Sequence, residues 1–74
     1  MKRQTVQQLF GERVRTLRAR VGFSQEELAE RAGLDRSYVG GVERGERNIS
    51  LENICKLATA LNVPASALME FDHK

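Results

Sequence analysis

The segment SQEELAERAGLDRSYVGGVE, residues 24–43, contains the pattern that determines the fold. It holds two short amphipathic stretches joined at one glycine, Gly33, and each stretch is too short to be stable as an isolated helix. Gly33 can take the positive φ that a bulky residue resists, and the small Ala29 lets two helices cross closely. Apolar residues at helical spacing complete the pattern: Leu28, Ala32, Leu34, Val39 and Val42. An ordinary helical hairpin would not need all of these features, so the segment predicts a helix-turn-helix.

Helical patterns continue on both sides of this motif. Before it, apolar residues at helical spacing predict a first helix over about residues 5–21, which ends at Gly22. Ser24 and Glu27 match a capping box for the second helix, and Asp35 is expected to cap the third.

The later part of the chain predicts two more helices. Ser50 is expected to cap a fourth helix, and Pro64 to open a short last helix that runs to Leu68. The fourth helix carries the apolar residues Leu51, Ile54, Leu57, Ala58 and Leu61. Because no stretch alternates apolar and polar residues as a strand would, the sequence predicts an all-α fold. We expect one compact five-helix domain over residues 1–74.

The composition favours a globular protein with an anionic partner. Of the 74 residues, 41% are hydrophobic and 30% are charged, which is a balance typical of folded domains. The net charge is only +2, but the first 20 residues hold six bases and one acid, and Arg36, Arg44 and Arg47 follow. A basic surface of this kind suits nucleic acid, although many solvated helix faces carry similar charge.

Other classes of function have little support in the sequence. The only histidine is His73, near the end of the chain, and the only cysteine is Cys55, which we expect to be a small buried residue of the fourth helix. No residues have metal-ligand spacing, so we expect no enzyme activity, metal, cofactor or small-molecule ligand. No apolar run is long enough to span a membrane, and a lone cysteine favours the cytoplasm.

A helix-turn-helix places the first turn of its second helix in the major groove of DNA. Here that turn contains Arg36, Ser37 and Tyr38. An arginine can pair bidentately with guanine, whereas a serine reads bases less sharply. Tyr38 can stack on DNA or bond a phosphate. The alternatives are a solvated Arg36 and a half-buried Tyr38 that only packs.

The stretch GFSQEELAERAGLDRSYVGGVERGERNISL, residues 22–51, resembles the helix-turn-helix of phage lambda-type repressor and Cro proteins, the Xre family. Within it, LDRSYVGGVERGERN, residues 34–48, resembles the controller proteins of restriction–modification systems. Those proteins are short, stand-alone dimers that regulate their own operon. The resemblance therefore implies a lambda-repressor-like fold and binding to double-stranded DNA.

The resemblance also implies roles for individual residues. The base-reading positions are Arg36, Ser37, Tyr38 and Gly41, of which Gly41 departs from the long polar residue common in the family. The positions that contact the DNA backbone are Gln25, Arg44, Arg47 and Asn48. Arg18 and Glu43 match a structural salt bridge between the first and third helices. The alternative for each of these residues is that it is a solvated side chain of a loop or helix, or only stabilises a turn.

A single domain of this size offers few DNA contacts, so we expect a homodimer on a roughly palindromic operator. The segment of about residues 62–72 has more apolar residues than a small core can bury, and Leu68, Met69 and Phe71 are the expected interface. The alternative is that they cover the monomer's own core. The function expected from the sequence is a DNA-binding transcriptional regulator, and the resemblance implies a restriction–modification controller. The alternative is an antitoxin or protein-binding adaptor of the same fold.

Overall fold

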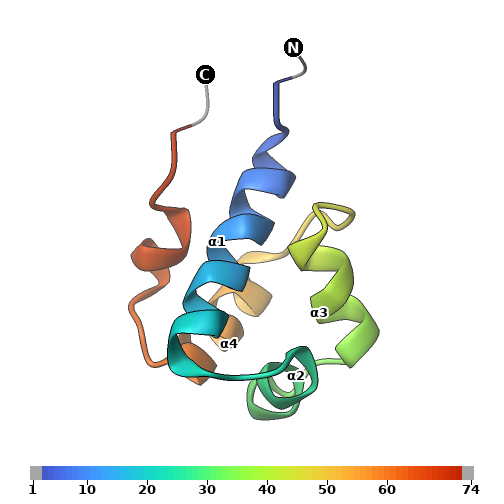
Figure 1. The fold of residues 1–74 in the computed structure, drawn as a ribbon, viewed down its shortest axis with the longest axis vertical. Helices are drawn as coiled ribbons and strands as arrows, with labels where there is room; N and C mark the ends of the chain where they lie inside the picture. The colour runs from blue at the N-terminus through green and yellow to red at the C-terminus, as the bar shows by residue number, and fades with distance from the viewer. Residues whose placement is uncertain (1–2, 73–74) are drawn as a thin grey trace.

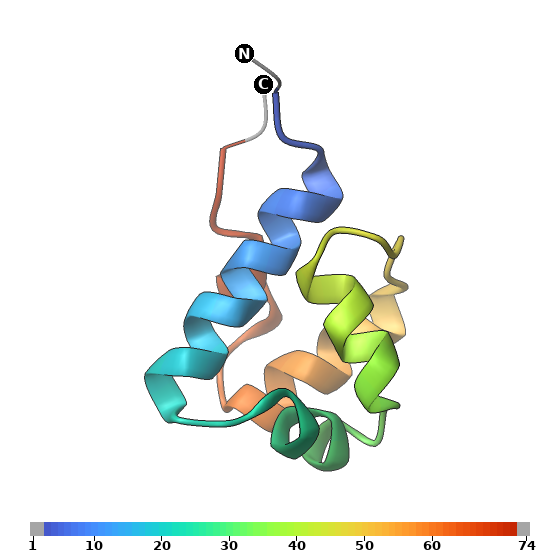
Figure 2. The ribbon, with the colours of Figure 1, turned by 45° about the vertical axis from the view of Figure 1, so that its right-hand side comes forward.

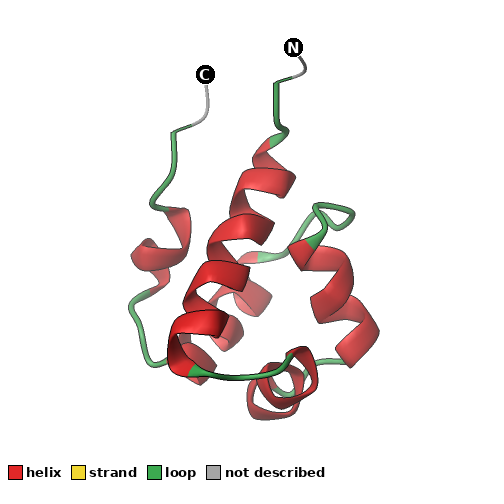
Figure 3. Ribbon diagram, viewed as in Figure 1, coloured by secondary structure: helices red, strands yellow, loops and turns green. Residues whose placement is uncertain are grey.

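A computed structural model describes residues 3–72, so His73 lies outside the described residues. The elements are α1 (Val6–Val21), α2 (Gln25–Ala32), α3 (Arg36–Glu43), α4 (Leu51–Leu61) and a terminal 3-10 helix, η1 (Ala65–Met69). Between residues 3 and 72 the chain forms helices and connecting loops without a strand (Figure 3). The all-α prediction is confirmed, and the short last helix is a 3-10 helix rather than an α-helix.

The helix ends form as the sequence predicts at most positions. The Ser24 hydroxyl accepts a hydrogen bond from the Glu27 backbone N–H, at 3.0 Å, which completes the capping box of α2. Gly22 and Gly33 follow α1 and α2 with φ of 82° and 69°. These left-handed conformations are the ones that glycine adopts most readily, so Gly33 permits the turn of the motif.

Two local predictions are wrong, those for Asp35 and Cys55, and the apolar Leu51 lies outside the core. The side chain of Asp35 makes no capping hydrogen bond at the start of α3. Leu51 is 82% exposed because the first turn of α4 extends beyond the core. Cys55, one turn later on the same side of α4, is exposed instead of buried.

The helices pack around α1, which contacts α3, α4 and η1 (Figure 1). The second view shows α2 below the other helices, beside one end of α3 and of α4 (Figure 2). All five elements contribute to one hydrophobic core. The buried core side chains are Phe10, Val14, Leu17, Leu28, Ala29, Ala32, Val39, Val42, Leu57, Ala58, Leu61 and Leu68.

The backbone of α1 lies close against that of α3 at Gly11, a position that the sequence analysis did not identify. A Cβ atom at this glycine would lie 2.3 Å from the carbonyl oxygen of Val42 and 2.5 Å from that of Glu43. Both are backbone atoms of α3, so a side chain at position 11 could be accommodated only if the two helices moved apart. Gly11 therefore sets the distance at which α3 is held against α1.

We predict that Gly11→Ala destabilises the fold although alanine favours helix. The added methyl group should separate α1 from α3 and lower the free energy of unfolding by about 3 kcal/mol, toward the upper end for overpacked cores. Urea unfolding followed by circular dichroism measures this change. The control is Gly40→Ala in α3, where the nearest atom to the new Cβ is the end of the Arg44 side chain, at 3.1 Å. Equal stability of the two variants would contradict the assignment.

Candidate nucleic-acid interface

The outer face of α3 is formed by Arg36, Ser37, Gly40 and Arg44. Together with Gln25 at the start of α2, these residues line a shallow hollow of about 230 Å³. Arg36 and Ser37 in the first turn are exposed. Arg36 makes no hydrogen bond or ion pair with any residue in the described range 3–72, so its guanidinium group is available to a partner.

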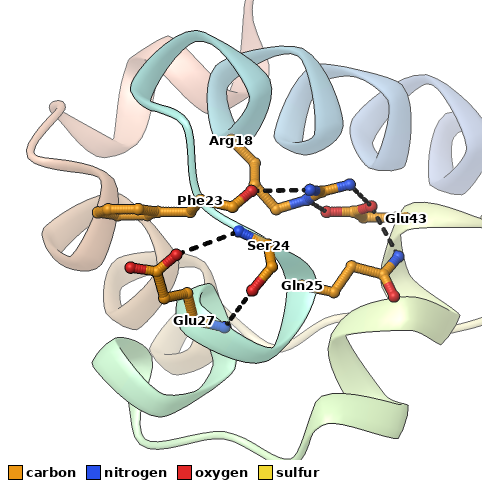
Figure 4. Close-up of polar contacts among 6 residues, drawn as sticks. All are labelled: Arg18, Phe23, Ser24, Gln25, Glu27 and Glu43. Atoms are coloured by element: carbon orange, nitrogen blue, oxygen red, sulfur yellow. Dashed lines mark hydrogen bonds and ion pairs between the residues drawn. The ribbon is translucent and has the colours of Figure 1, made fainter.

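Glu43 is the polar centre of the contact between α1, α2 and α3 (Figure 4). Its carboxylate accepts hydrogen bonds from Arg18 Nε at 2.6 Å and Arg18 Nη2 at 3.0 Å. A third bond comes from Gln25 Nε2 at 3.0 Å. The hydrogen bond to Glu43 raises the pKa of Arg18, which stays charged. The structure thus contains the Arg18–Glu43 ion pair that the resemblance implies.

Arg18 and Gln25 have further contacts around this centre. Arg18 Nη1 donates to the carbonyl oxygen of Phe23, at 2.9 Å, and so fixes the link between α1 and α2. The Gln25 side chain is tied to Glu43 and also lies beside Gly40. Its amide oxygen remains on the rim of the hollow, next to the N-terminus of α2.

Tyr38 is half-buried and packs against the core. Its hydroxyl accepts a hydrogen bond from Asn53 Nδ2 of α4, at 3.1 Å. The Arg47 guanidinium carbon lies 5.4 Å from the centre of the ring, within cation–π range. Sequence reasoning did not identify Asn53, because nothing local marks the residue of α4 that meets Tyr38. Tyr38 therefore packs against the core, and its ring also contacts Arg47.

The loop after α3 carries the other predicted DNA contacts. Arg44 Nε and Nη2 donate to the two carboxylate oxygens of Glu46, at 3.0 and 3.2 Å. This hydrogen bonding holds the pKa of Glu46 below its usual range, with the charges of Arg44 and Arg47 adding to the effect. Arg47 is exposed and lies against Gly41, while Asn48 is exposed in the loop. One of the predicted backbone-contacting arginines is thus already paired to an acid.

The C-terminal segment differs from the predicted interface. Leu68 is completely buried in the core, so its assignment to a dimer interface is wrong. Phe71 is half-buried and packs against the same core. Arg13 of α1 holds this segment in place, because its Nε donates to the Ala67 carbonyl at 2.7 Å. Only Met69, at 49% exposure, presents a largely free apolar side chain among the three predicted residues.

Metal sites and membrane-spanning helices are both absent from the part of the chain that the structure describes. Within residues 3–72, no three His, Cys, Asp or Glu side chains are grouped so that they could hold a metal ion. In the same range no helix has the length and apolar character needed to cross a membrane.

Comparison with known proteins agrees with this geometry. A helix-turn-helix family model matches residues 14–68. The control protein C.BamHI of Bacillus amyloliquefaciens is 45% identical over 64 residues, which are 85% of this chain and 79% of that protein. The crystal structure of the restriction–modification controller protein C.AhdI from Aeromonas hydrophila has a TM-score of 0.83 and 61% identity, covering 84% of this chain and 94% of that one.

A third similar structure is that of C.Esp1396I bound to a 25 base pair operator site. It has a TM-score of 0.81 and 26% identity, covering 92% of this chain and 90% of that chain. The family model by itself spans more than half of the chain. The chain therefore belongs to the helix-turn-helix family, of the lambda-repressor-like (Xre) type that includes the control proteins of restriction–modification systems.

Proposed function

We propose that this protein is a sequence-specific regulator that binds operator DNA and controls the transcription of a restriction–modification operon. The observation that carries the proposal is the outer face of α3, where Arg36 is exposed and without a partner in residues 3–72. The similarity to C.BamHI and C.AhdI supports the choice of operon. Because operator DNA would be its partner, we propose that the protein acts in the cytoplasm.

The geometry supports a defined orientation on the duplex. With the first turn of α3 in the major groove, Arg36 and Ser37 meet base edges, and α2 crosses the backbone. The N-terminus of α2, with Gln25, then faces a phosphate and offers its backbone N–H groups. Arg44 and Asn48 flank the other side of the groove. An adaptor that binds protein would have no need of this set, which favours DNA as the partner.

We propose that the protein acts as a homodimer, and that the interface is an apolar patch made of Val6, Ile49, Leu51, Ile54 and Met69. Four of these residues, all except Leu51, help to line a hollow of about 150 Å³. Val6, Leu51 and Met69 are 39%, 82% and 49% exposed. Leu51 lies one helical turn before Ile54 and extends the patch along α4.

A second copy of the chain is the occupant that the patch fits best. A two-fold contact uses each exposed apolar residue twice, once from either protomer. Two copies would present two α3 helices to half-sites about 34 Å apart, which is one turn of DNA, on a roughly palindromic operator. Met69 belongs both to the interface predicted from the sequence and to this patch. The buried Leu68 is not part of the patch, whose other residues come from α1, from α4 and from the loop before α4.

We predict that Arg36→Ala relaxes sequence specificity, whereas Arg44→Ala weakens binding to all duplexes alike. Loss of a bidentate base contact should cost about 1–3 kcal/mol on the preferred site only. Loss of a phosphate contact should reduce the slope of log affinity against log salt by about one. Fluorescence anisotropy with a selected duplex and a scrambled duplex, over about 50–200 mM salt, measures both effects. Equal losses on the two duplexes for Arg36→Ala would refute its role in reading bases.

We predict that Glu46→Gln increases DNA affinity. The substitution removes a negative charge from the binding surface and frees Arg44 from its ion pair. The salt dependence should become steeper by about one phosphate contact. The same titration checks this, with Glu30→Gln, an exposed acid of α2, as the control for net charge. If both substitutions raise affinity equally, only net charge matters.

We predict that Leu51→Glu dissociates the dimer without unfolding the chain. Leu51 is exposed in the first turn of α4, where an acid suits the helix dipole, so the helix should stay folded. Sedimentation at micromolar concentration should show monomer, and operator affinity should fall in parallel. The control is Val21→Glu, since Val21 is 46% exposed at the other end of α1 from Val6. A wild-type protein that sediments as a monomer, or equal effects of the two variants, would contradict the interface.

A further inference from the structure

The middle of α3 contains two adjacent glycines, Gly40 and Gly41. Each lowers the stability of a helix by about 1 kcal/mol relative to alanine, and α3 has only eight residues. Neither glycine has a positive φ, so backbone conformation does not require them. The side chains that lie over the two glycines are therefore the features that can explain them.

Gly41 lies beneath the stem of the Arg47 side chain. A Cβ atom at Gly41 would lie 3.1 Å from Cγ, 3.2 Å from Nε and 3.7 Å from Cδ of Arg47. The guanidinium carbon of the same side chain is 5.4 Å from the centre of the Tyr38 ring. Tyr38 is three residues before Gly41, so ring and glycine are neighbours on one helix surface. Arg47 thus lies across α3, over the glycine and beside the ring.

Gly40 has a different neighbourhood. The atoms nearest to a Cβ there are the ends of flexible side chains, Arg44 Nη1 at 3.1 Å and Gln25 Oε1 at 3.5 Å. Arg44 is held in addition by Glu46, through an ion pair that does not involve the helix surface. A side chain at position 40 would therefore deflect only the end of Arg44, whereas a side chain at position 41 would displace Arg47 along its length.

We propose that Gly41 is a positioning residue that determines specificity, because its missing side chain leaves the slot in which Arg47 lies on the outer face of α3. Gly41 is one helical turn after Ser37, and Arg47 occupies the space that a side chain at position 41 would fill. We expect the Arg47 guanidinium to reach the major groove from this place and to read the acceptor atoms of a base, as an arginine does with guanine. Arg47 is then a base-reading residue supplied by the loop rather than a backbone contact.

The inference rests on the proposed function, and its first test needs no DNA. In the free protein, ring current from Tyr38 should shift the Arg47 side-chain protons upfield in NMR spectra. We expect Gly41→Leu to abolish this shift, Gly41→Ala to reduce it, and Gly40→Ala to preserve it. Circular dichroism should show that all three variants keep their helices, since each substitution favours helix over glycine. If the upfield shift of the Arg47 protons persists in Gly41→Leu, the proposal that Gly41 leaves space for Arg47 is wrong.

The second test measures discrimination between two probes: a duplex that the wild-type protein enriches from a random-sequence pool, and a scrambled duplex of equal length. We expect Gly41→Leu to lower the ratio of the two affinities roughly tenfold, as loss of one arginine–base contact would. Arg47→Ala should lower it equally, and the double variant should lose no more than either single variant. Thr59→Ala, at an exposed position of α4 outside the outer face of α3, should leave the ratio unchanged.

The outcomes separate the inference from the function on which it rests. A wild-type protein that does not distinguish the two duplexes overturns both. A wild-type protein that does distinguish them, combined with an unchanged ratio in Gly41→Leu or in Arg47→Ala, overturns the inference alone. Additive losses in the double variant do the same, because they would mean that Gly41 acts independently of Arg47.

Discussion

The buried carboxylate of Glu43 is the interaction on which the placement of α3 depends. Its side chain is only 3% exposed and needs hydrogen-bond donors, because an unpaired charge in such a place would be very costly. Arg18 of α1 and Gln25 of α2 supply those donors (Figure 4). Removing one partner of a buried ion pair typically costs about 3–5 kcal/mol, so the three helices are joined at one point.

This polar centre has a steric counterpart about two helical turns before Arg18 in α1, at Gly11. The Glu43 carbonyl is among the backbone atoms that approach Gly11, so α1 and α3 touch through backbone at one point and through charged side chains at another. Two contacts of different kinds fix both the separation and the direction of α3. The outer face of α3 is consequently held in a defined position relative to α1 and α2.

The sequence predicted the features whose causes are local. Gly33, the Ser24 capping box and the helical periods are properties of neighbouring residues, and the structure has them all. The Arg18–Glu43 pair came only from resemblance to a family. The error at Cys55 shows the limit of such reasoning: a helical period says which residues share a face, but not how far the core extends along that face.

The candidate site also has some features that the sequence could predict and others that it could not. The exposure of Arg36 and Ser37 follows from their place in the first turn of α3. The pairing of Arg44 with Glu46 and the bond from Asn53 to Tyr38 depend on the path of a loop and on how α4 meets α3. No pattern in the sequence carries that information, so the identities of the basic residues were predictable and their partners were not.

The contact of Arg47 with the Tyr38 ring also has an entropic consequence. A long side chain that is free in solution loses rotamers when it is immobilised in a complex, at a cost of about 0.5–1.5 kcal/mol. Arg47 already lies against a ring that Asn53 holds in place, so part of its rotamer freedom is lost when the chain folds. In the proposed complex with DNA, part of the ordering cost of Arg47 would thus fall on folding instead of on association, and a loop residue would have the preorganisation usually found in a helix.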